Sequence, residues 1–372
     1  MAPNNSGGQV ATPIQVVFQG GGAKLCLMLV VCEVLKKYEA DNRIKVEKAA
    51  GSSAGAIAAV MLASKKSPET YKIAIKAIGA RYLPMMKVRW WRGAWRVFNG
   101  RAYFPDLNLE RLFDELFCQN DGPKRLNDLR FEVELYFTDL FSLNARYAPS
   151  DEAIPKALAR SCRFPFAFVG FASKDTEVDG GLALNLAVDR LKQDESTNGR
   201  VIGISFSAAF GNSAKSNLLS FTQQLFSAAI QSEVSRSEAI LGRQNVFLID
   251  TNIGTFDFVD ALGDGLGVHY DLVLLRFQTW LEGWLGSFGP IGLDPSGHTS
   301  KLLRPVLSNT QLASPIAREI DDRLKSEPCT HALGAFTYET AMLDGHGEFL
   351  GKYRTRIETV FRVIRRTNVF AV

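Results

Sequence analysis

The first 63 residues contain one local pattern twice, and this pattern constrains the fold more than any other feature of the chain. An apolar run, Pro13–Phe18, is followed by glycines and by a long apolar segment, Leu25–Tyr38. A second run, Ile44–Ala50, ends in another glycine-containing turn and leads into the alanine-rich segment Ala54–Ala63. Successive strand–turn–helix units place their strands parallel in one sheet with helices on its faces. The sequence therefore predicts an α/β fold with a mainly parallel central sheet.

Further strands and helices are expected along the chain. Runs of β-branched and aromatic residues predict strands, and longer apolar segments with helical spacing predict helices. The expected strands are Arg130–Asp139, Phe168–Phe171, Val201–Phe206 and Asn245–Asp250. The expected helices are Leu107–Cys118, Leu218–Leu241 and Tyr270–Leu285.

We expect the chain to be divided into three parts. Residues 1–12 lack the basic and apolar regions of a signal peptide and are expected to form a flexible arm. Residues 13–260 are expected to form the α/β catalytic domain. Residues 261–372 are expected to form an additional, mostly helical C-terminal region packed on that domain.

Charge, cysteine usage and hydropathy exclude several classes of protein. A formal net charge of +4 is too small to indicate a nucleic-acid partner. Five widely spaced cysteines indicate reduced thiols in a cytoplasmic setting, and four histidines without ligand spacing indicate no metal site and no cofactor. The longest apolar runs are shorter than the roughly 20 residues that span a bilayer. We therefore expect a cytoplasmic protein whose contact with a membrane is at most peripheral, and its oligomeric state is left open.

The turn after the second strand is the strongest indication of chemistry. Its sequence is Gly51-Ser52-Ser53-Ala54-Gly55, a G-x-S-x-G pentapeptide in the strand-to-helix setting of a nucleophile elbow. There the serine sits on a sharp turn, and small neighbours such as Gly51 and Gly55 let the two limbs pass. A helix that begins directly after the serine also favours developing negative charge beside it. Ser53 is therefore the expected nucleophile of an acyl hydrolase.

The turn after the first strand supplies candidate donors for an oxyanion. Its backbone N–H groups are expected at the same edge of the sheet as the serine. The turn fits neither a Walker phosphate loop nor a G-x-G-x-x-G dinucleotide loop. Lys24 either positions the loop, meets a lipid phosphate or is an ordinary surface lysine. The candidate oxyanion residues are Gly20, Gly21, Gly22 and Ala23.

A base for the serine is expected at Asp179. Every histidine lies at or beyond residue 269 and outside any motif, whereas Asp179 ends a β-like run. The two glycines that follow, Gly180 and Gly181, allow close backbone approach. An aspartate of ordinary pKa, about 4, is a weak base, so burial beside the nucleophile has to raise its basicity. An isolated Asp-Gly-Gly is also common in surface turns.

These motifs together resemble the patatin-like phospholipase family. The family's G-G-G-x-[RK] loop is matched at residues 20–24, its G-x-S-x-G elbow at 51–55 and its D-G-[GA] motif at 179–181. The segments Ala157–Pro165 and Asn185–Val188 are similar to those that flank the family's aspartate. The resemblance covers roughly residues 13–260, and residues 261–372 match nothing recognisable.

The resemblance implies a three-layer α/β/α patatin-like fold and a lipid acyl hydrolase of phospholipase A type. Its substrates would be the fatty-acyl esters of membrane phospholipids. Ser53 would attack the ester, Asp179 would accept its proton and then activate water, and the glycine loop would bind the oxyanion. No cofactor or metal is implied.

Two other functions stay open. An α/β-hydrolase esterase would use Ser53, an acid such as Asp179 or Asp250, and His269 as its base. In that fold several strands precede the elbow, whereas only one strand–helix unit does so here. A protein that binds lipid or a partner without turnover would keep the same fold.

A separate window of the sequence suggests contact with a membrane. Between Thr70 and Pro105 there is no Asp or Glu, and the window holds three of the five tryptophans. Basic residues interleaved with tryptophan suit an anionic membrane interface. The alternative is a solvated basic face with the tryptophans packed in the core. The membrane-contact candidates are Trp90, Trp91, Trp95, Arg89, Arg92 and Arg96.

Overall fold

The computed structural model of the chain describes residues 11–287, apart from 87–88, 105–106, 120–121, 171, 192–199, 208–217, 252 and 254–265. The chain divides into two units, Met1–Leu274 and Leu275–Val372, and the sheet and the candidate site belong to the first. Most of the expected N-terminal arm and of the expected C-terminal region lies outside the described residues. The boundaries predicted for those two parts therefore stay predictions.

A seven-stranded, mainly parallel sheet forms the centre of the first unit. Its strand order is β4-β3-β2-β1-β6-β7, with β5 also paired to β3. All neighbouring pairs from β3 to β7 in this order are parallel, whereas β4 and β5 are antiparallel to β3. The strands are β1 (Thr12–Phe18), β2 (Ile44–Ser52), β3 (Glu132–Asp139), β4 (Asn144–Tyr147), β5 (Glu177–Asp179), β6 (Val201–Phe206) and β7 (Val246–Ile249).

The pairing of β1 with β2 contains one irregularity. Ile14 lies opposite Val46, but Gln15 lies opposite Lys48, so β2 has one extra residue at this point. Beyond it the pairing is regular and ends with Phe18 opposite Gly51. This register places the turn after β1 beside the turn after β2.

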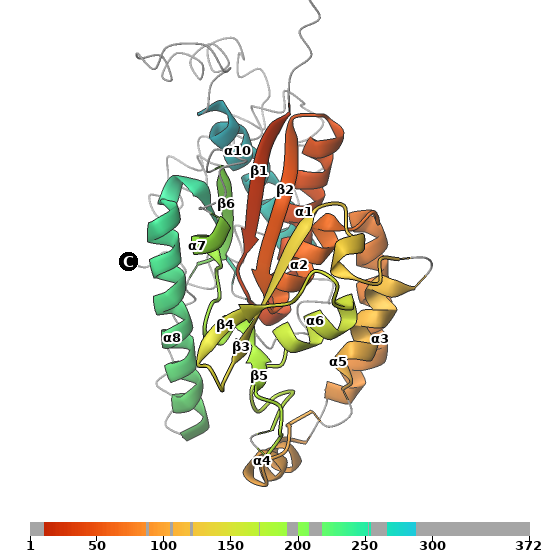
Figure 1. Cartoon of the computed structure of the whole chain (residues 1–372), viewed down its shortest axis with the longest axis vertical. Helices are drawn as coiled ribbons and strands as arrows, with labels where there is room; N and C mark the ends of the chain where they lie inside the picture. Colours follow the sequence, from red (N-terminus) through yellow and green to blue (C-terminus); the bar gives the residue numbers. More distant parts are fainter. Residues whose placement is uncertain are drawn as a thin grey trace, which may run out of the picture. The chain divides into compact units, whose positions relative to one another are not determined.

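Helices cover both faces of the sheet. Figure 1 shows α8 on one side of it and α1, α2 and α3 on the other. The described helices are α1 (Leu25–Ala40), α2 (Ala54–Ala63), α3 (Pro68–Met86), α4 (Trp90–Phe98), α5 (Leu109–Phe113), α6 (Ile154–Ser161), α7 (Val188–Leu191), α8 (Leu218–Leu241) and α10 (Leu266–Gly286). The three-layer α/β/α architecture expected from the sequence is confirmed.

Apolar burial explains why the first two helices pack where they do. Every residue of α2 is buried, and most of α1 is buried as well. A helix that is apolar all round is stable only when it is covered on all sides. These helices meet that condition by packing on the sheet and on each other.

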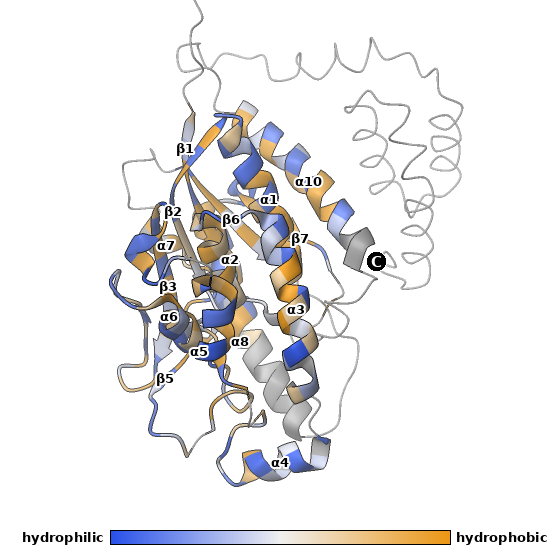
Figure 2. Cartoon of the chain, turned by 90° about the vertical axis from the view of Figure 1, so that its right-hand side faces the viewer, coloured by the Kyte–Doolittle hydropathy of each residue, from blue (hydrophilic) through white to orange (hydrophobic). Residues whose placement is uncertain are grey.

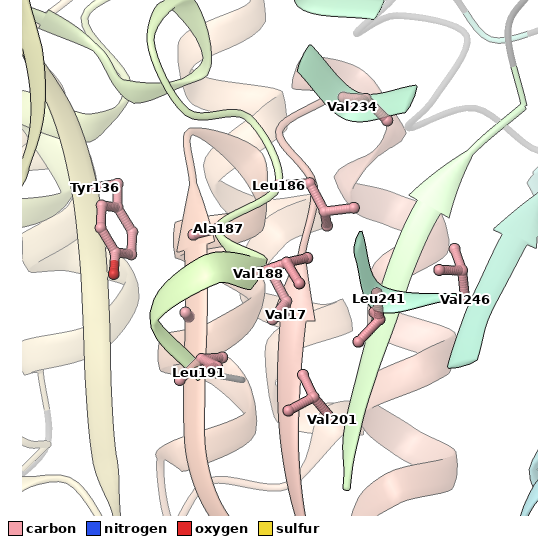
Figure 3. Close-up of a cluster of buried hydrophobic side chains, with 11 residues drawn as sticks. Val17, Tyr136, Leu186, Ala187, Val188, Leu191, Val201, Val234, Leu241 and Val246 are labelled. Atoms are coloured by element: carbon pink, nitrogen blue, oxygen red, sulfur yellow. The ribbon is translucent and has the colours of Figure 1, made fainter. Parts of the chain in front are cut away.

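A hydrophobic cluster joins the other face of the sheet to α7 and α8 (Figure 3). Its valine and leucine side chains come from three strands, from both helices and from the segment just before α7. Each fully buried one contributes about 1.5–3 kcal/mol to stability. The segment that follows Asp179 therefore lies between the sheet and α8. The cluster consists of Val17, Ala50, Tyr136, Leu186, Ala187, Val188, Leu191, Val201, Val234, Leu241 and Val246.

One strand prediction is wrong. Residues 166–168 form a turn, Val169 forms only an isolated bridge with Pro165, and the short strand of this region is β5, at Glu177–Asp179. The preceding segment forms its backbone hydrogen bonds with another loop: Tyr103 N–H donates to Phe166 O, and Phe104 N–H donates to Ala167 O. Its aromatic residues thus gave a strand-like pattern where the backbone is not paired in the sheet.

The described residues contain neither a disulfide nor a helix able to span a membrane. The four cysteines among them, Cys26, Cys32, Cys118 and Cys162, form no disulfide. In the same part of the chain, no helix combines the length and apolar character needed to cross a bilayer.

Candidate active site

Ser53 lies on a strained turn between β2 and α2. Its backbone φ of 53° and ψ of −122° are unusual for a residue with a side chain. A Cβ at Gly51 would lie 2.3 Å from the carbonyl oxygen of Gly55, and a Cβ at Gly55 would lie 2.3 Å from that of Phe18. Both glycines are therefore required by the close approach of strand and helix. This is the geometry of a nucleophile elbow.

The strained turn is held by a hydrogen bond from another helix. Ser53 N–H donates to Ser161 Oγ at 2.9 Å, and Ser161 Oγ donates to the carbonyl oxygen of Tyr136 at 2.6 Å. Ser161 is the last residue of α6 and is fully buried. The N–H group of Ser53 is thus occupied, so donors for an oxyanion at this site would have to come from elsewhere.

Asp179 faces Ser53 from the end of β5. Gly181 N–H donates to Asp179 Oδ1 at 2.9 Å, and the Ser53 hydroxyl lies near enough to the carboxylate to lower its pKa. Only 3% of Asp179 is exposed. Burial raises the pKa of this carboxyl from 3.8 to about 6, and these two groups partly oppose that rise. The group is therefore a stronger base than an exposed aspartate.

Close contacts leave no room for a side chain at either of the two glycines after Asp179. A Cβ at Gly180 would lie 2.2 Å from the carbonyl oxygen of Tyr136, and one at Gly181 would lie 2.7 Å from Asn185 Oδ1. Larger residues at either position would push the aspartate away from the serine. The Asp-Gly-Gly motif is thus part of the buried site, and its interpretation as a surface turn is wrong.

The glycine loop after β1 lies beside the serine. A Cβ at Gly20 would lie 3.4 Å from Ser53 Cβ. The N–H group of Gly20 is already bonded to Asn185, at 3.1 Å to Oδ1 and 3.2 Å to the carbonyl oxygen. The N–H groups of Gly21, Gly22 and Ala23 have no acceptor among the described residues. Of the four predicted oxyanion residues, these three keep a free donor.

Lys24 and Gly21 both contact Phe206, at the end of β6. Lys24 Nζ lies 4.9 Å from the centroid of the ring, and a Cβ at Gly21 would lie 2.6 Å from a ring carbon. Burial lowers the pKa of Lys24. These contacts favour a role for Lys24 in positioning the loop over the role of an ordinary surface lysine.

Asn185 and Ser161 are site residues to which the sequence assigned no role. Both fall in segments whose likeness to the family was noted, which is the signal that could have found them. The backbone N–H of Asn185 donates to Glu233 Oε2 of α8 at 2.8 Å. The amide that holds Gly20 is thus itself held by a helix on the far side of the sheet.

Cys162 also borders the serine. Its thiol is in hydrogen-bonding contact with Ser53 and near the Asp179 carboxylate. Burial, and secondarily that carboxylate, raises the pKa of the thiol well above its usual value. The thiol is therefore protonated at neutral pH and is a poor nucleophile beside the serine.

The residues of the alternative triad are not brought together with the serine in the described part of the chain. Asp250 follows β7 and is exposed. His269 belongs to α10, and its side chain lies outside the described side chains. Among the described residues, no group of three or more His, Cys, Asp or Glu could hold a metal ion.

The predicted membrane-contact residues lie on or next to α4. Trp91 and Trp95 are exposed, so the alternative in which these two tryptophans pack in the core is wrong. Arg89 and Arg92 are exposed as well, and Arg96 is half-buried. The side chain of Trp90 lies outside the described ones.

A serine on a strand-to-helix elbow, near a buried carboxylate and flanked by free backbone donors, is the arrangement that hydrolases of the acyl-transfer class use. Residues 16–192 match the patatin-like phospholipase family. These residues therefore form a patatin-like phospholipase domain. Domains of this family are hydrolases of lipid esters.

Two solved structures are distantly similar. VipD from Legionella pneumophila is 13% identical, with a TM-score of 0.39, over 77% of this chain and 69% of that one. ExoU in its complex with SpcU, from the type III secretion system of Pseudomonas aeruginosa, is 15% identical, with a TM-score of 0.41, over 90% of this chain and 66% of that one. The chain thus spans about two thirds of each, and likeness at this level says nothing about substrate. No curated protein matches the chain in sequence.

Proposed function

We propose that the chain is a lipid acyl hydrolase of phospholipase A type that cleaves fatty-acyl esters of membrane phospholipids with a Ser53–Asp179 dyad. The observation that carries this proposal is the strained strand-to-helix elbow at Ser53, with the buried Asp179 carboxylate near enough to its hydroxyl for the hydroxyl to lower the carboxyl's pKa. The raised pKa of that carboxyl, about 6, supports a role as base near neutral pH, where it is ionised yet basic enough to accept a proton.

The chemistry follows in two halves. In the first, Ser53 Oγ adds to the ester carbonyl carbon while its proton passes to Asp179, and the N–H groups of Gly21, Gly22 and Ala23 stabilise the oxyanion. The carbon–oxygen bond to the alcohol then breaks, and the alcohol leaves with the proton from Asp179. In the second half, water gives a proton to Asp179 and adds to the acyl-enzyme. The bond to Ser53 then breaks, Asp179 returns the proton to Ser53 Oγ, and the fatty acid is released.

The decisive experiment compares variants in fatty-acid release from phospholipid vesicles and in hydrolysis of a monomeric short-chain ester. Ser53→Ala and Asp179→Ala are each expected to lower turnover on the order of a thousandfold or more. Ser52→Ala, which removes the neighbouring hydroxyl of the same elbow, is the matched control and is expected to retain turnover. Its hydroxyl donates to the carbonyl oxygen of Leu184 and does not face the carboxylate.

His269→Ala separates the dyad from the alternative esterase. Turnover retained in His269→Ala and lost in Asp179→Ala supports the dyad. The reverse result would assign the base to histidine. Ester hydrolysis that survives Ser53→Ala would remove the serine mechanism altogether, and absence of turnover in the wild type on both substrates would favour a protein that only binds lipid.

A further inference from the structure

Helix α4 exposes three large apolar side chains on one face. Trp91, Trp95 and Phe98 stand at positions i, i+4 and i+7, so they lie on one side of the helix. They are 49%, 67% and 78% exposed. The rings of Trp95 and Phe98 stack with centroids 6.0 Å apart. Such a contiguous apolar surface indicates an interaction site, because isolated domains seldom expose one.

Residues on other sides of α4 pack inward. Gly93 is buried, and a Cβ there would lie 2.1 Å from the ring of Tyr103. Arg96 Nε donates to the carbonyl oxygen of Ala102 at 2.9 Å. Among the described side chains of α4, Gly93 and Arg96 thus face the rest of the protein, whereas Trp91, Trp95 and Phe98 face outward.

Positive charge surrounds the aromatic face. Arg89 and Arg92 are exposed, and the guanidinium of Arg92 lies 5.2 Å from the centroid of the Trp91 ring. No acidic residue occurs in the sequence from Thr70 to Pro105. Indole rings favour the boundary between headgroups and acyl chains, while arginines bind headgroup phosphates. The charge and the aromatic residues thus complement an anionic phospholipid surface.

Backbone hydrogen bonds connect α4 to the candidate active site. The segment after the helix pairs with the loop that follows Cys162: Tyr103 N–H donates to Phe166 O at 2.7 Å, and Ala172 N–H donates to Gly100 O at 3.0 Å. The same loop begins at Arg163, whose carbonyl oxygen accepts from Asp179 N–H at 2.9 Å.

The two views place α4 at one end of the first unit (Figures 1 and 2). In Figure 1 this is the end toward which β1 and β2 run, and Ser53 and the glycine loop follow these two strands. The exposed aromatic face and the candidate active site therefore share one end of the sheet.

We propose that α4 is an interfacial docking helix that binds the surface of an anionic phospholipid bilayer through Trp91, Trp95, Phe98 and the flanking arginines. Docking brings the candidate active site to its substrate. The identity of that substrate rests on the proposed function, but binding to the surface needs no turnover.

The test measures binding of the full chain carrying Ser53→Ala, which prevents any hydrolysis of the vesicles. Co-sedimentation is compared for vesicles of phosphatidylcholine alone and for vesicles with added phosphatidylglycerol. In this Ser53→Ala background, the double substitution Trp91→Ala/Trp95→Ala is expected to weaken partition onto the anionic vesicles on the order of tenfold or more. Added Arg89→Gln/Arg92→Gln is expected to weaken it on the order of tenfold at low salt and to reduce its dependence on salt.

Phe141→Ala is the matched control. Phe141 is 88% exposed on the turn between β3 and β4, but it lies beside the Asp139 carboxylate, whose ion pair with Arg146 leaves no net positive charge there for anionic headgroups. Partition of this variant is expected to be unchanged. Loss of partition equal to that of the tryptophan variant would overturn the assignment to α4.

Other outcomes decide the proposal as well. Absence of binding to either vesicle, or equal binding to both, overturns it, and the first result would leave α4 as a surface for a protein partner. Hydrolysis of a monomeric ester by the chain with Ser53 intact is measured in a separate assay, independent of vesicle binding. Vesicle binding without ester turnover overturns the proposed function and leaves docking standing, whereas ester turnover without vesicle binding overturns docking alone.

Discussion

Replacing Asp179 with asparagine is expected to stabilise the protein at neutral pH while it abolishes turnover. The carboxyl has a pKa of about 6 in the folded chain and an ordinary value of 3.8 when exposed. Since each tenfold change in an ionisation constant is worth about 1.4 kcal/mol, ionising the buried group costs the folded state about 3 kcal/mol at pH 7. Asparagine fills the same volume, keeps an oxygen for the Gly181 N–H group and never ionises.

The direction in which stability changes with pH follows from the protons that the folded and unfolded chains bind. Between pH 3.8 and about 6 the folded chain holds the Asp179 proton more tightly than the unfolded chain does. Stability from this group is therefore full below the lower value and is lost as the pH rises through about 6. The free energy of unfolding of Asp179→Asn relative to wild type is expected to rise by about 3 kcal/mol from pH 4 to pH 7. Any constant effect of the amide on packing cancels in that comparison.

Urea denaturation of both chains at a series of pH values measures this difference. Asp139→Asn is the control of opposite sign, because hydrogen bonds from the Ser142 hydroxyl and the Phe141 N–H hold the pKa of Asp139 below its usual value. That variant is expected to lose stability at neutral pH and to approach wild type in acid. A difference between Asp179→Asn and wild type that stays constant from pH 4 to pH 7 would refute the reasoning.

Three further predictions concern turnover and folding. The kcat/KM of the wild type is expected to fall below a pKa of about 6 as Asp179 becomes protonated, and a limb near pH 4 in the rate profile would argue against this base. Gly51→Ala is expected to destabilise the chain on the order of 3 kcal/mol or more, since its Cβ would lie 2.3 Å from backbone atoms of Gly55. Gly283→Ala lies on an open part of α10 and is expected to stabilise the chain by about 1 kcal/mol. If the two alanine variants changed the thermal unfolding of the chain equally, the steric argument would be contradicted. Asn185→Ala removes the side-chain acceptor of the Gly20 N–H and leaves only the backbone carbonyl of residue 185. It is expected to lower kcat on the order of tenfold with KM unchanged; a change in KM alone would exclude a role in holding the oxyanion loop.

The sequence predicted those parts of the fold that depend on local pattern. The paired strand–turn–helix units placed Ser53 correctly between β2 and α2, and the Asp-Gly-Gly motif located Asp179 at a strand end. It missed β4 because a strand of four residues, three of them exposed, carries little apolar signal. It placed the strand before the aspartate at Phe168–Phe171 because aromatic loop residues resemble a buried strand.

The supporting contacts of the site could not be predicted, because they join residues far apart in the chain. The bond from Ser53 N–H to Ser161 spans 108 residues, and the bond from Gly20 N–H to Asn185 spans 165. No spacing rule connects such positions. For the same reason the sequence could not show that Gly20 has no free donor, or that the aromatic side of α4 faces outward.

The extra residue in β2 matters for how relatives of this chain are recognised. It advances β2 by one residue against β1, so that Phe18 ends opposite Gly51. Deletion of Glu47 would restore a regular ladder and shift the elbow by about 3.3 Å relative to the glycine loop. Such a gene would still encode every motif residue of an intact enzyme, yet its product would hold them out of reach of one another. A motif search would count it as active, and only the spacing between the motifs would reveal that it is not.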